Sequence, residues 1–325
     1  MKFLVTGITG FVGPNMVKLL LNKGHEVCAI FRSKDSFQRL KRFFTESEFN
    51  QIDFRNAELN SNELDQIIGE GFDGIFHFAA MAHPPTGFKD PVNTFKVNVM
   101  GSIRLINAVQ KYSPKTIIQY CSTSEVYGNL CKENGILKEN DLLIPNNPYG
   151  VSKASVDLFM QERMINGFIK GMVTRAFSHT GPMRGQNFSI SSDAYQIAKM
   201  KIGKQEKILK VGNLKTKRAV MDVRDCCNAY YCLMMEPKAQ GQVFNICDEN
   251  IHEMQYYTDL LIDISGLDGI VQEIEPKFYR PIDIDIQIGD NTKINQMIDW
   301  NKMKRIPIKQ TLEDLLNYWI KEMEG

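Results

Sequence analysis

The sequence lacks the features that mark several classes of protein. Its 325 residues contain no apolar run of the roughly eighteen residues that a membrane-spanning helix requires. The formal net charge is only +1, so no basic surface typical of nucleic-acid or anionic-membrane binding is expected. It also has no internal repeat and no low-complexity tract. These absences favour an ordinary globular protein that binds neither nucleic acid nor membrane.

The seven cysteines argue against a disulfide framework and against a metal site. Their number is odd, their spacing matches no metal motif, and the adjacent Cys226 and Cys227 cannot form an ordinary bridge. The apolar run within residues 1–7 is too short for a signal peptide and reads instead as a buried strand. We therefore expect a reduced, cytoplasmic protein without a bound metal.

The hydrophobic fraction of the whole chain is 43%, which is ordinary for a globular protein. Strand and helix patterns alternate through its first half. Short apolar runs predict strands at 3–5, 26–31, 51–54, 74–80, 116–120 and 172–176. The alternation becomes irregular near residue 177. We predict an α/β fold: a Rossmann-type doubly wound parallel sheet over residues 1–176, with returning segments near 220–247. Residues 177–325 should mainly form a smaller, discontinuous α/β substrate domain.

A glycine motif lies between the first predicted strand and the first predicted helix. It reads Gly7, Thr9, Gly10, Phe11, Val12 and Gly13, with Ile8 between the first two. Glycines at this spacing allow a tight turn, and the helix N-terminus that follows faces a pyrophosphate. A plain glycine turn is the alternative, but the flanking strand and helix favour dinucleotide binding.

The end of the second predicted strand bears on the choice between NADP and NAD. An acidic residue that bonds the ribose 2′-hydroxyl is usual there in NAD-specific folds. This chain instead has Arg32 and Ser33, which suit a 2′-phosphate. We predict NADP, with NAD as the alternative, because Asp35 becomes a ribose ligand after a slip of one residue. Arg32 could also be a solvated loop cation.

Other residues at predicted strand ends are candidates for the cofactor site. Asp53 and the adjacent Phe54 are expected near the adenine edge. The fourth predicted strand ends in Phe78, Ala79 and Ala80, where the small residues leave room for a cofactor. Asn98, at the start of the next predicted helix, is a candidate to contact the cofactor. We interpret His77 as a satisfied core histidine, whereas His83 is a candidate to face the cofactor or substrate.

The strongest chemical signal combines the segment 121–128 with Tyr149 and Lys153. A lysine four residues after a tyrosine lies one helical turn on, where its charge can stabilise a phenolate. Thr123 can bond a substrate oxygen, while Glu125 can take or give a second proton. The Tyr-x-x-x-Lys spacing alone is weak, but the glycine motif and the serine–threonine–serine–glutamate run strengthen it. We predict catalytic roles for Thr123, Ser124, Glu125, Tyr149 and Lys153.

Over nearly its whole length the chain resembles the extended short-chain dehydrogenase/reductases that modify nucleotide sugars. Residues 122–125 and 184–188 are similar to segments of GDP-mannose 4,6-dehydratases, and the former also to UDP-glucuronate decarboxylases. Residues 177–182 and 210–214 resemble GDP-4-keto-6-deoxymannose reductases. The resemblance implies a GDP-sugar substrate, and adds His179 to the cofactor site and Ser178, Asn187, Val211 and Asn213 to the substrate site. Ser178 departs from the asparagine of the family.

The resemblance also implies a reaction. In a 4,6-dehydratase Tyr149 deprotonates the sugar 4-hydroxyl, Glu125 takes the C5 proton, and Ser124 or Glu125 protonates the leaving oxygen. A simple reductase leaves Glu125 without a role, so the glutamate favours dehydration; a reductase, an epimerase, a decarboxylase and a non-catalytic scaffold are the alternatives. Cations should flank the diphosphate, and we propose Arg218, Arg280 and Arg184. Relatives often form homodimers or larger homo-oligomers through helices near 95–111 and 149–166.

Overall fold

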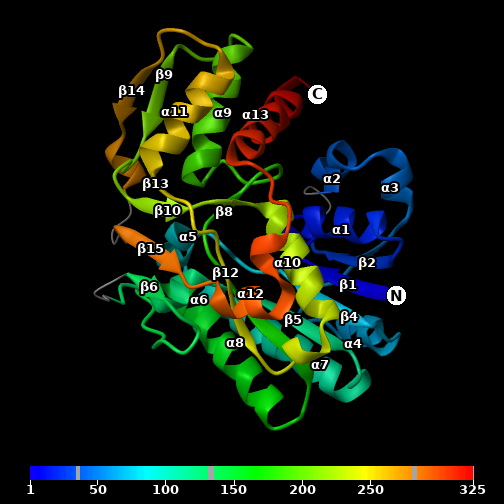
Figure 1. The fold of residues 1–325 in the computed structure, drawn as a ribbon. Coiled ribbons are helices and arrows are strands. Elements are labelled where there is room, and N and C mark those ends of the chain that lie inside the picture. Colours follow the sequence, from blue (N-terminus) through cyan, green and yellow to red (C-terminus); the bar gives the residue numbers. More distant parts are fainter. Residues whose placement is uncertain (34–36, 131–134, 280–283, 325) are drawn as a thin grey trace.

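The computed structural model describes residues 1–33, 37–130, 135–279 and 284–324 (Figure 1). Its centre is a sheet of seven parallel strands in the order β12-β7-β5-β4-β1-β2-β3. The strands are β1 (Lys2–Thr6), β2 (Glu26–Phe31), β3 (Ile52–Asn56), β4 (Gly74–His77), β5 (Ile117–Thr123), β7 (Lys170–Ala176) and β12 (Val243–Ile246). The order reverses between β1 and β4, as the predicted Rossmann-type fold requires, and that prediction is confirmed.

The inner strands of this sheet are buried on both faces, which explains why strands such as β1 are read as continuous apolar runs. In β1, Phe3 and Val5 belong to one buried cluster and Leu4 to the other. One face is covered by α1 (Val12–Asn22), α2 (Phe37–Phe43), α10 (Val223–Met235) and α12 (Thr292–Ile298), and the other by α4 (Asn62–Gly69), α7 (Gly101–Tyr112) and α8 (Pro148–Ile165). Burying the two rows of side chains supplies most of the stabilisation of this part.

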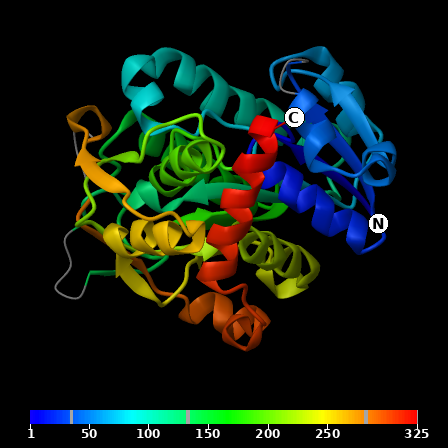
Figure 2. The same ribbon diagram turned by 90° about the horizontal axis from the view of Figure 1, so that it is seen from above.

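A smaller lobe lies beyond the carboxyl ends of the strands (Figure 1). Its core packs α9 (Ser189–Lys201), α11 (Met254–Ser265) and α13 (Ile308–Glu324) against β9 (Ile208–Val211), which pairs with β14 (Val271–Ile274). Figure 2 shows α13, in red, at the side of this lobe that faces α1, in blue. The remaining helices and helical turns of at least five residues are α3 (Glu46–Asn50), α5 (Pro84–Lys89), α6 (Pro91–Phe95) and the wide π-type turn Lys96–Met100.

Two small sheets connect the lobes. One has the order β13-β10-β15-β6, formed by β13 (Ile251–Glu253), β10 (Lys217–Ala219), β15 (Ile286–Gly289) and β6 (Ile136–Leu137). The other pairs β8 (His179–Thr180) with β11 (Met221–Asp222). Each brings together segments that are far apart in the sequence. The smaller lobe is therefore built from several returns of the chain.

Several predicted boundaries are corrected. The fourth strand ends at His77 rather than at residue 80, and α9 begins at Ser189, inside a segment rich in glycine, serine and asparagine. Residues 129–148 are polar and have no strand pattern, yet they contain β6, a strand of two residues that exists because β15 pairs with it. Such pairing is a tertiary effect that leaves no local pattern. No helix in the described ranges is long and apolar enough to cross a membrane.

Candidate active site

The glycine motif forms a tight turn between β1 and α1. Gly7 has a φ of +78°, and a Cβ there would lie 2.8 Å from the backbone nitrogen of Ala79. A Cβ on Gly13 would lie 2.4 Å from the carbonyl oxygen of Gly7. A side chain at either position is therefore excluded, and the backbone stays open at the sheet's switch point, where such folds bind ligands.

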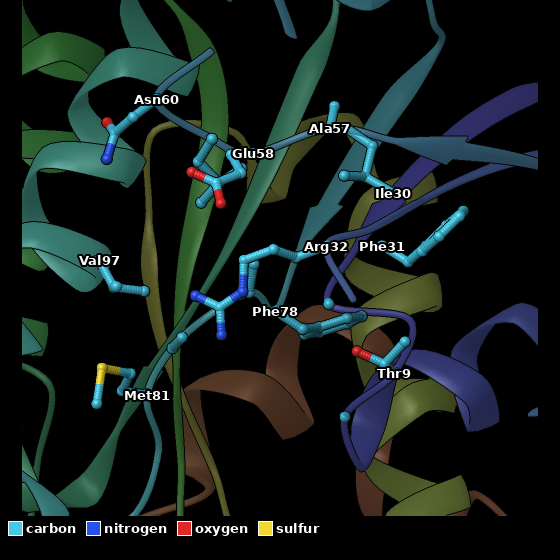
Figure 3. Close-up of a pocket in the computed structure, with 15 residues that line it drawn as sticks. Thr9, Ile30, Phe31, Arg32, Ala57, Glu58, Asn60, Phe78, Met81 and Val97 are labelled. Carbon is cyan, nitrogen blue, oxygen red and sulfur yellow. The ribbon is translucent and has the colours of Figure 1, made fainter. Parts of the chain in front are cut away.

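One cavity extends from this turn across the ends of β2 and β3 (Figure 3). Arg32 reaches into it from the end of β2, and Glu58 lies beside it on the segment after β3. Thr9 and the predicted Phe78, Ala79 and Ala80 also line it. Ser33 does not, and Asp35 lies outside the described residues. The sequence reading missed residues 57–60, which form the wall after β3.

The structure does not place Asp53 or Phe54 at this cavity. Strand β3 runs to Asn56, two residues beyond its predicted end, so both positions lie within the strand. The Asp53 carboxylate accepts a hydrogen bond from Arg55 Nε at 2.7 Å, while Phe54 packs against Phe37. Ligands bind beyond the carboxyl ends of parallel strands, and at β3 the cavity is lined by residues 57–60, which follow the strand.

Two predicted polar residues support the wall from behind. His77 bonds Thr6 Oγ1 through Nδ1 at 2.7 Å and Ser102 Oγ through Nε2 at 2.9 Å, and burial lowers its pKa to about 3. This confirms His77 as a satisfied core histidine. Asn98, in the wide turn before α7, accepts from Met81 N at 2.7 Å and donates to Ser152 Oγ at 2.9 Å. It orients the loop after β4 but does not line the cavity.

A second cavity brings all five predicted catalytic residues together. It shares Gly7, Gly10, Phe78 and Ala80 with the first, so the two form one continuous site. Thr123, Ser124 and Glu125 enter it from the end of β5, while Tyr149 and Lys153 enter it from the first turns of α8. Phe11 and Val12 line it as well. A hydroxyl, a carboxylate, a phenol and an amine thus face one space.

Burial controls the charges of the tyrosine and the lysine. It raises the pKa of Tyr149, and a hydrogen bond with Thr123 together with the charge of Arg184 opposes that rise. Burial lowers the pKa of Lys153 to about 8, although Cys121 and Asp157 oppose the change. The Lys153 ammonium lies 4.3 Å from the centre of the Tyr120 ring, which stabilises its charge. Both groups are held in surroundings where proton transfer is sensitive to a bound ligand.

Asn147 fixes the position of the predicted base. Its Oδ1 accepts from Gly150 N at 2.8 Å and caps α8, so its Nδ2 must face the other way. That nitrogen donates to Glu125 Oε2 at 2.8 Å. Asn147 was not among the sequence candidates, although an asparagine directly before Pro148 is a recognisable helix-cap signal. The residue that starts the catalytic helix also holds the carboxylate.

Gln287 is the second residue that the sequence reading missed. It lies on β15, is only 5% exposed, and lines the catalytic cavity. Ser124 Oγ donates to Gln287 Oε1 at 2.9 Å, and Gln287 Nε2 donates to the Ser124 carbonyl oxygen at 3.1 Å. The two residues are 163 positions apart in the chain. No signal within residues 286–289 points to this contact.

Four predicted residues of the C-terminal half line the catalytic cavity: Ser178, His179, Arg184 and Arg218. The Arg184 guanidinium lies 4.7 Å from the centre of the Phe11 ring and 3.5 Å from that of Phe188. Met183, which precedes it, has a φ of +75°, so the backbone is strained where it presents the arginine. Burial lowers the pKa of His179, which stacks on Phe11, to about 4.

The other predicted substrate residues are not brought to the cavity. His83 bonds Thr86 at 3.0 Å, and Asn187 is exposed. Val211 is the last residue of β9 and is 2% exposed, because it packs into the hydrophobic core of the smaller lobe. Asn213 accepts from Lys215 N at 3.1 Å in a local turn. Arg280 lies outside the described residues, so its predicted role stays a prediction.

Comparisons with known proteins agree with this geometry. The family model described as GDP-mannose 4,6 dehydratase matches residues 4–314. The GDP-6-deoxy-D-mannose reductase of Pseudomonas aeruginosa is 29% identical over 98% of this chain and 97% of its own. The GDP-mannose 4,6-dehydratase of Vibrio cholerae is 25% identical over 97% of this chain and 94% of its own.

Solved structures have the same fold. The structure of the enzyme called RMD from Pseudomonas aeruginosa, complexed with NADPH, gives a TM-score of 0.82 at 26% identity and covers 99% of both chains. A UDP-glucuronic acid 4-epimerase of Bacillus cereus, in complex with NAD and a fluorinated sugar nucleotide, gives a TM-score of 0.85 at 22% identity and so supports the fold alone.

The fold and the cavity define an enzyme of the nucleotide-sugar short-chain dehydrogenase/reductase class. Within that class, the chain belongs to the GDP-mannose 4,6-dehydratase family, whose model spans residues 4–314. The predicted resemblance is therefore confirmed at the level of the family. The members named above include both a dehydratase and a reductase.

Proposed function

We propose that the protein is a GDP-sugar 4,6-dehydratase that forms a GDP-4-keto-6-deoxy sugar. The observation that carries the proposal is the position of Glu125. Its carboxylate lines the same cavity as Thr123 and Tyr149 and is held there by Asn147 at 2.8 Å. Water loss from C6 needs a base at C5 as well as a base at the 4-hydroxyl, and this cavity contains a candidate for each.

The residues present fit a dinucleotide cofactor. The glycine turn leaves backbone approach open beside the N-terminus of α1, where a pyrophosphate is stabilised. Arg32 lines the far end of the continuous cavity and supports NADP as the cofactor, with NAD as the alternative. A dinucleotide held by these residues would supply the hydride acceptor for C4 and the hydride donor for C6, and so would be regenerated in each turnover.

The protein's own residues move the protons. Tyr149, as a phenolate stabilised by the ammonium of Lys153, takes the proton of the 4-hydroxyl, and Thr123 donates a hydrogen bond to the same oxygen. The resulting C4 ketone acidifies the C5 hydrogen, which Glu125 removes. The C6–O bond then breaks, and the hydroxyl takes up a proton and leaves as water. A proton returns to C5, so one water is lost in total. The cations Arg184 and Arg218 are proposed to stabilise the diphosphate.

A second candidate function is reduction of a GDP-4-keto-6-deoxy sugar by NADPH. It is favoured by the likeness to the Pseudomonas aeruginosa reductase over 98% of this chain. Such a reaction requires Thr123, Tyr149 and Lys153 but no base at C5. The position of Glu125 would then have no chemical use, so we place the dehydratase first.

One incubation tests both. The purified protein, with no cofactor added, is mixed with GDP-mannose or with GDP-N-acetylglucosamine, and the products are followed by mass spectrometry and NMR. Loss of one water with formation of a 4-keto-6-deoxy sugar is the expected result, and it identifies the sugar. No water loss, combined with NADPH oxidation when a GDP-4-keto-6-deoxy sugar is supplied, would overturn the dehydratase and establish the reductase.

A further inference from the structure

The contact between Gln287 and Ser124 reaches from the C-terminal part of the chain into the catalytic segment. Ser124 directly precedes Glu125 and follows Thr123, so any constraint on it affects both neighbours. Ser124 is 4% exposed and Gln287 is 5% exposed, yet both line the cavity. Each of them therefore presents only a small polar surface to a ligand, and the hydrogen bonds between them decide what that surface offers.

The hydrogen-bond roles in this pair follow from elementary chemistry. The Ser124 carbonyl oxygen can only accept, so the amide atom 3.1 Å from it must be the Gln287 nitrogen. The Gln287 oxygen then faces Ser124 Oγ at 2.9 Å, and that oxygen can only accept. The hydroxyl must therefore donate its one proton to Gln287. The reversed amide would set two acceptors against each other, so the orientation is unique.

A serine hydroxyl has one proton and two lone pairs. With the proton engaged by Gln287, Ser124 can offer only a lone pair to a molecule in the cavity. We propose that Gln287 is a positioning residue that holds the Ser124 hydroxyl as a hydrogen-bond acceptor for the sugar. The acid step at C6 is then left to Glu125, the remaining candidate. This inference rests on the proposed dehydratase function and deepens it.

Within the elimination of water, Glu125 alone carries the proton. It takes the proton of the C5–H bond, and the electrons of that bond form the C5–C6 double bond as the C6–O bond breaks. The same proton is then delivered to the departing hydroxyl, which leaves as water. Ser124 accepts a hydrogen bond from the hydroxyl at C6 before it leaves and gives up no proton. Glu125 thereby returns to its carboxylate form. The proton that returns to C5 is balanced by the one that Tyr149 took from the 4-hydroxyl, so Tyr149 also returns to its phenolate form.

The strand that carries Gln287 also contacts Arg218, the residue that we propose binds the diphosphate. Gln287 lies directly opposite Arg218 in the parallel pairing of β15 with β10. The Arg218 guanidinium donates through Nη2 to the carbonyl oxygen of Ile284, two residues before β15, at 2.6 Å. The other edge of β15 pairs with β6, in the loop between the catalytic segment and α8. One strand thus sets the positions of Arg218 and Ser124 together.

A double-mutant cycle on the purified enzyme tests the proposal. The variants are Gln287→Met, which keeps the length of the side chain, Ser124→Ala, and the combination. Gln272→Met is the control, because Gln272 lies on β14, in the outer sheet of the smaller lobe, and bonds Gln255 and Asp259. Two steps are followed separately: reduction of the bound cofactor by its absorbance, and loss of water by mass spectrometry.

We expect each single variant to slow water loss roughly tenfold while cofactor reduction stays within about twofold, as loss of the neutral hydrogen bonding between the two side chains suggests. The double variant should be no slower than Ser124→Ala, and Gln272→Met should match the wild type. Two results would overturn the proposal: single effects that multiply, or equal losses in both steps, which would indicate a purely structural role.

The wild-type enzyme separates this proposal from the proposed function. Wild-type protein that oxidises NADPH but releases no water overturns the dehydratase. In that case the double-mutant cycle of Gln287→Met and Ser124→Ala is measured through the rate of NADPH oxidation and the KM for the keto sugar. Effects that do not multiply still support the pairing of Gln287 with Ser124, whereas effects that multiply overturn it in that reaction too.

Discussion

Asn147 joins the catalytic helix to the predicted base: its Nδ2 donates to Glu125 Oε2 at 2.8 Å while its Oδ1 accepts from Gly150 N at 2.8 Å. Because the cap fixes the orientation of the amide, the direction of the carboxylate follows from the start of α8. This link couples local helix geometry to the position of the proposed base, and it can be broken in two ways that differ in their effect on stability.

The first prediction uses that difference. Asn147→Asp keeps the cap but sets a second carboxylate against Glu125, so water loss should fall by at least tenfold while the thermal midpoint changes little. Asn147→Ala removes both contacts and should in addition cost about 1 kcal/mol of unfolding free energy. Thermal unfolding and product analysis measure the two effects. An aspartate variant with full activity would show that the contact does not serve catalysis.

The second prediction concerns the base itself. Glu125→Gln keeps the shape of the side chain but cannot take the C5 proton. We expect water loss to be abolished, whereas reduction of the bound cofactor by the sugar continues, because Thr123, Tyr149 and Lys153 are unchanged. Absorbance of the reduced cofactor and mass spectrometry of the sugar distinguish the steps. Normal turnover in this variant would remove Glu125 from the mechanism.

Cofactor preference provides the third prediction. Arg32 lines the cavity at the end of β2, so Arg32→Ala should weaken NADPH binding about tenfold by removing a charge-assisted hydrogen bond to the 2′-phosphate. NADH binding should change by less than about threefold. The control is Arg42→Ala, since Arg42 pairs with Glu322 outside this cavity. Fluorescence titration gives both constants, and equal losses for the two cofactors would argue against a phosphate contact.

A buried carboxyl group yields the fourth prediction, on stability against pH. Burial raises the pKa of Asp193 from 3.8 to about 7, although a hydrogen bond from Thr258 opposes the rise. Because the pKa in the folded state lies above that in the unfolded state, the folded state loses stability as the pH rises from about 4 to about 7. The cost is complete above pH 7.

Asp193→Asn keeps an acceptor for Thr258 and removes that cost. Its stabilisation should therefore be larger at pH 8.5 than at pH 5, by roughly 2–3 kcal/mol. Chemical denaturation at the two pH values measures the difference. The exposed Asp263→Asn on α11 serves as the control, and a stabilisation independent of pH would contradict the assignment.

The fifth prediction concerns assembly, which the sequence suggests through its resemblance to dimeric relatives. Three apolar residues spaced by seven lie exposed along α8: Val151 at 37%, Leu158 at 56% and Ile165 at 79%. This spacing places them along one side of the helix. Leu158→Glu should convert a dimer into a monomer in size-exclusion chromatography with light scattering. Ile274→Glu, in the smaller lobe, should not; a single size for all three proteins would reject this interface.

Predictions from sequence succeeded where the signal was local. The glycine turn and the Tyr149–Lys153 spacing could be read because the backbone conformations they require depend on a few consecutive residues. The same reading placed Asp53 at the cavity because it ended β3 two residues early, and it placed Val211 there although a paired strand buries it. Errors of one or two residues at a strand end decide which side chain meets a ligand.

The sequence by itself determined the parallel sheet, the turn at Gly7 and the five candidate catalytic residues between Thr123 and Lys153, because hydrophobic periodicity, glycine conformation and helical spacing act over short distances. Only the tertiary structure decided that Asn147 holds Glu125 and that Gln287 holds Ser124 across 163 positions. Those contacts depend on how β15 and α8 pack against the end of β5. Packing of distant segments is set by the whole core, and no short stretch of sequence records it.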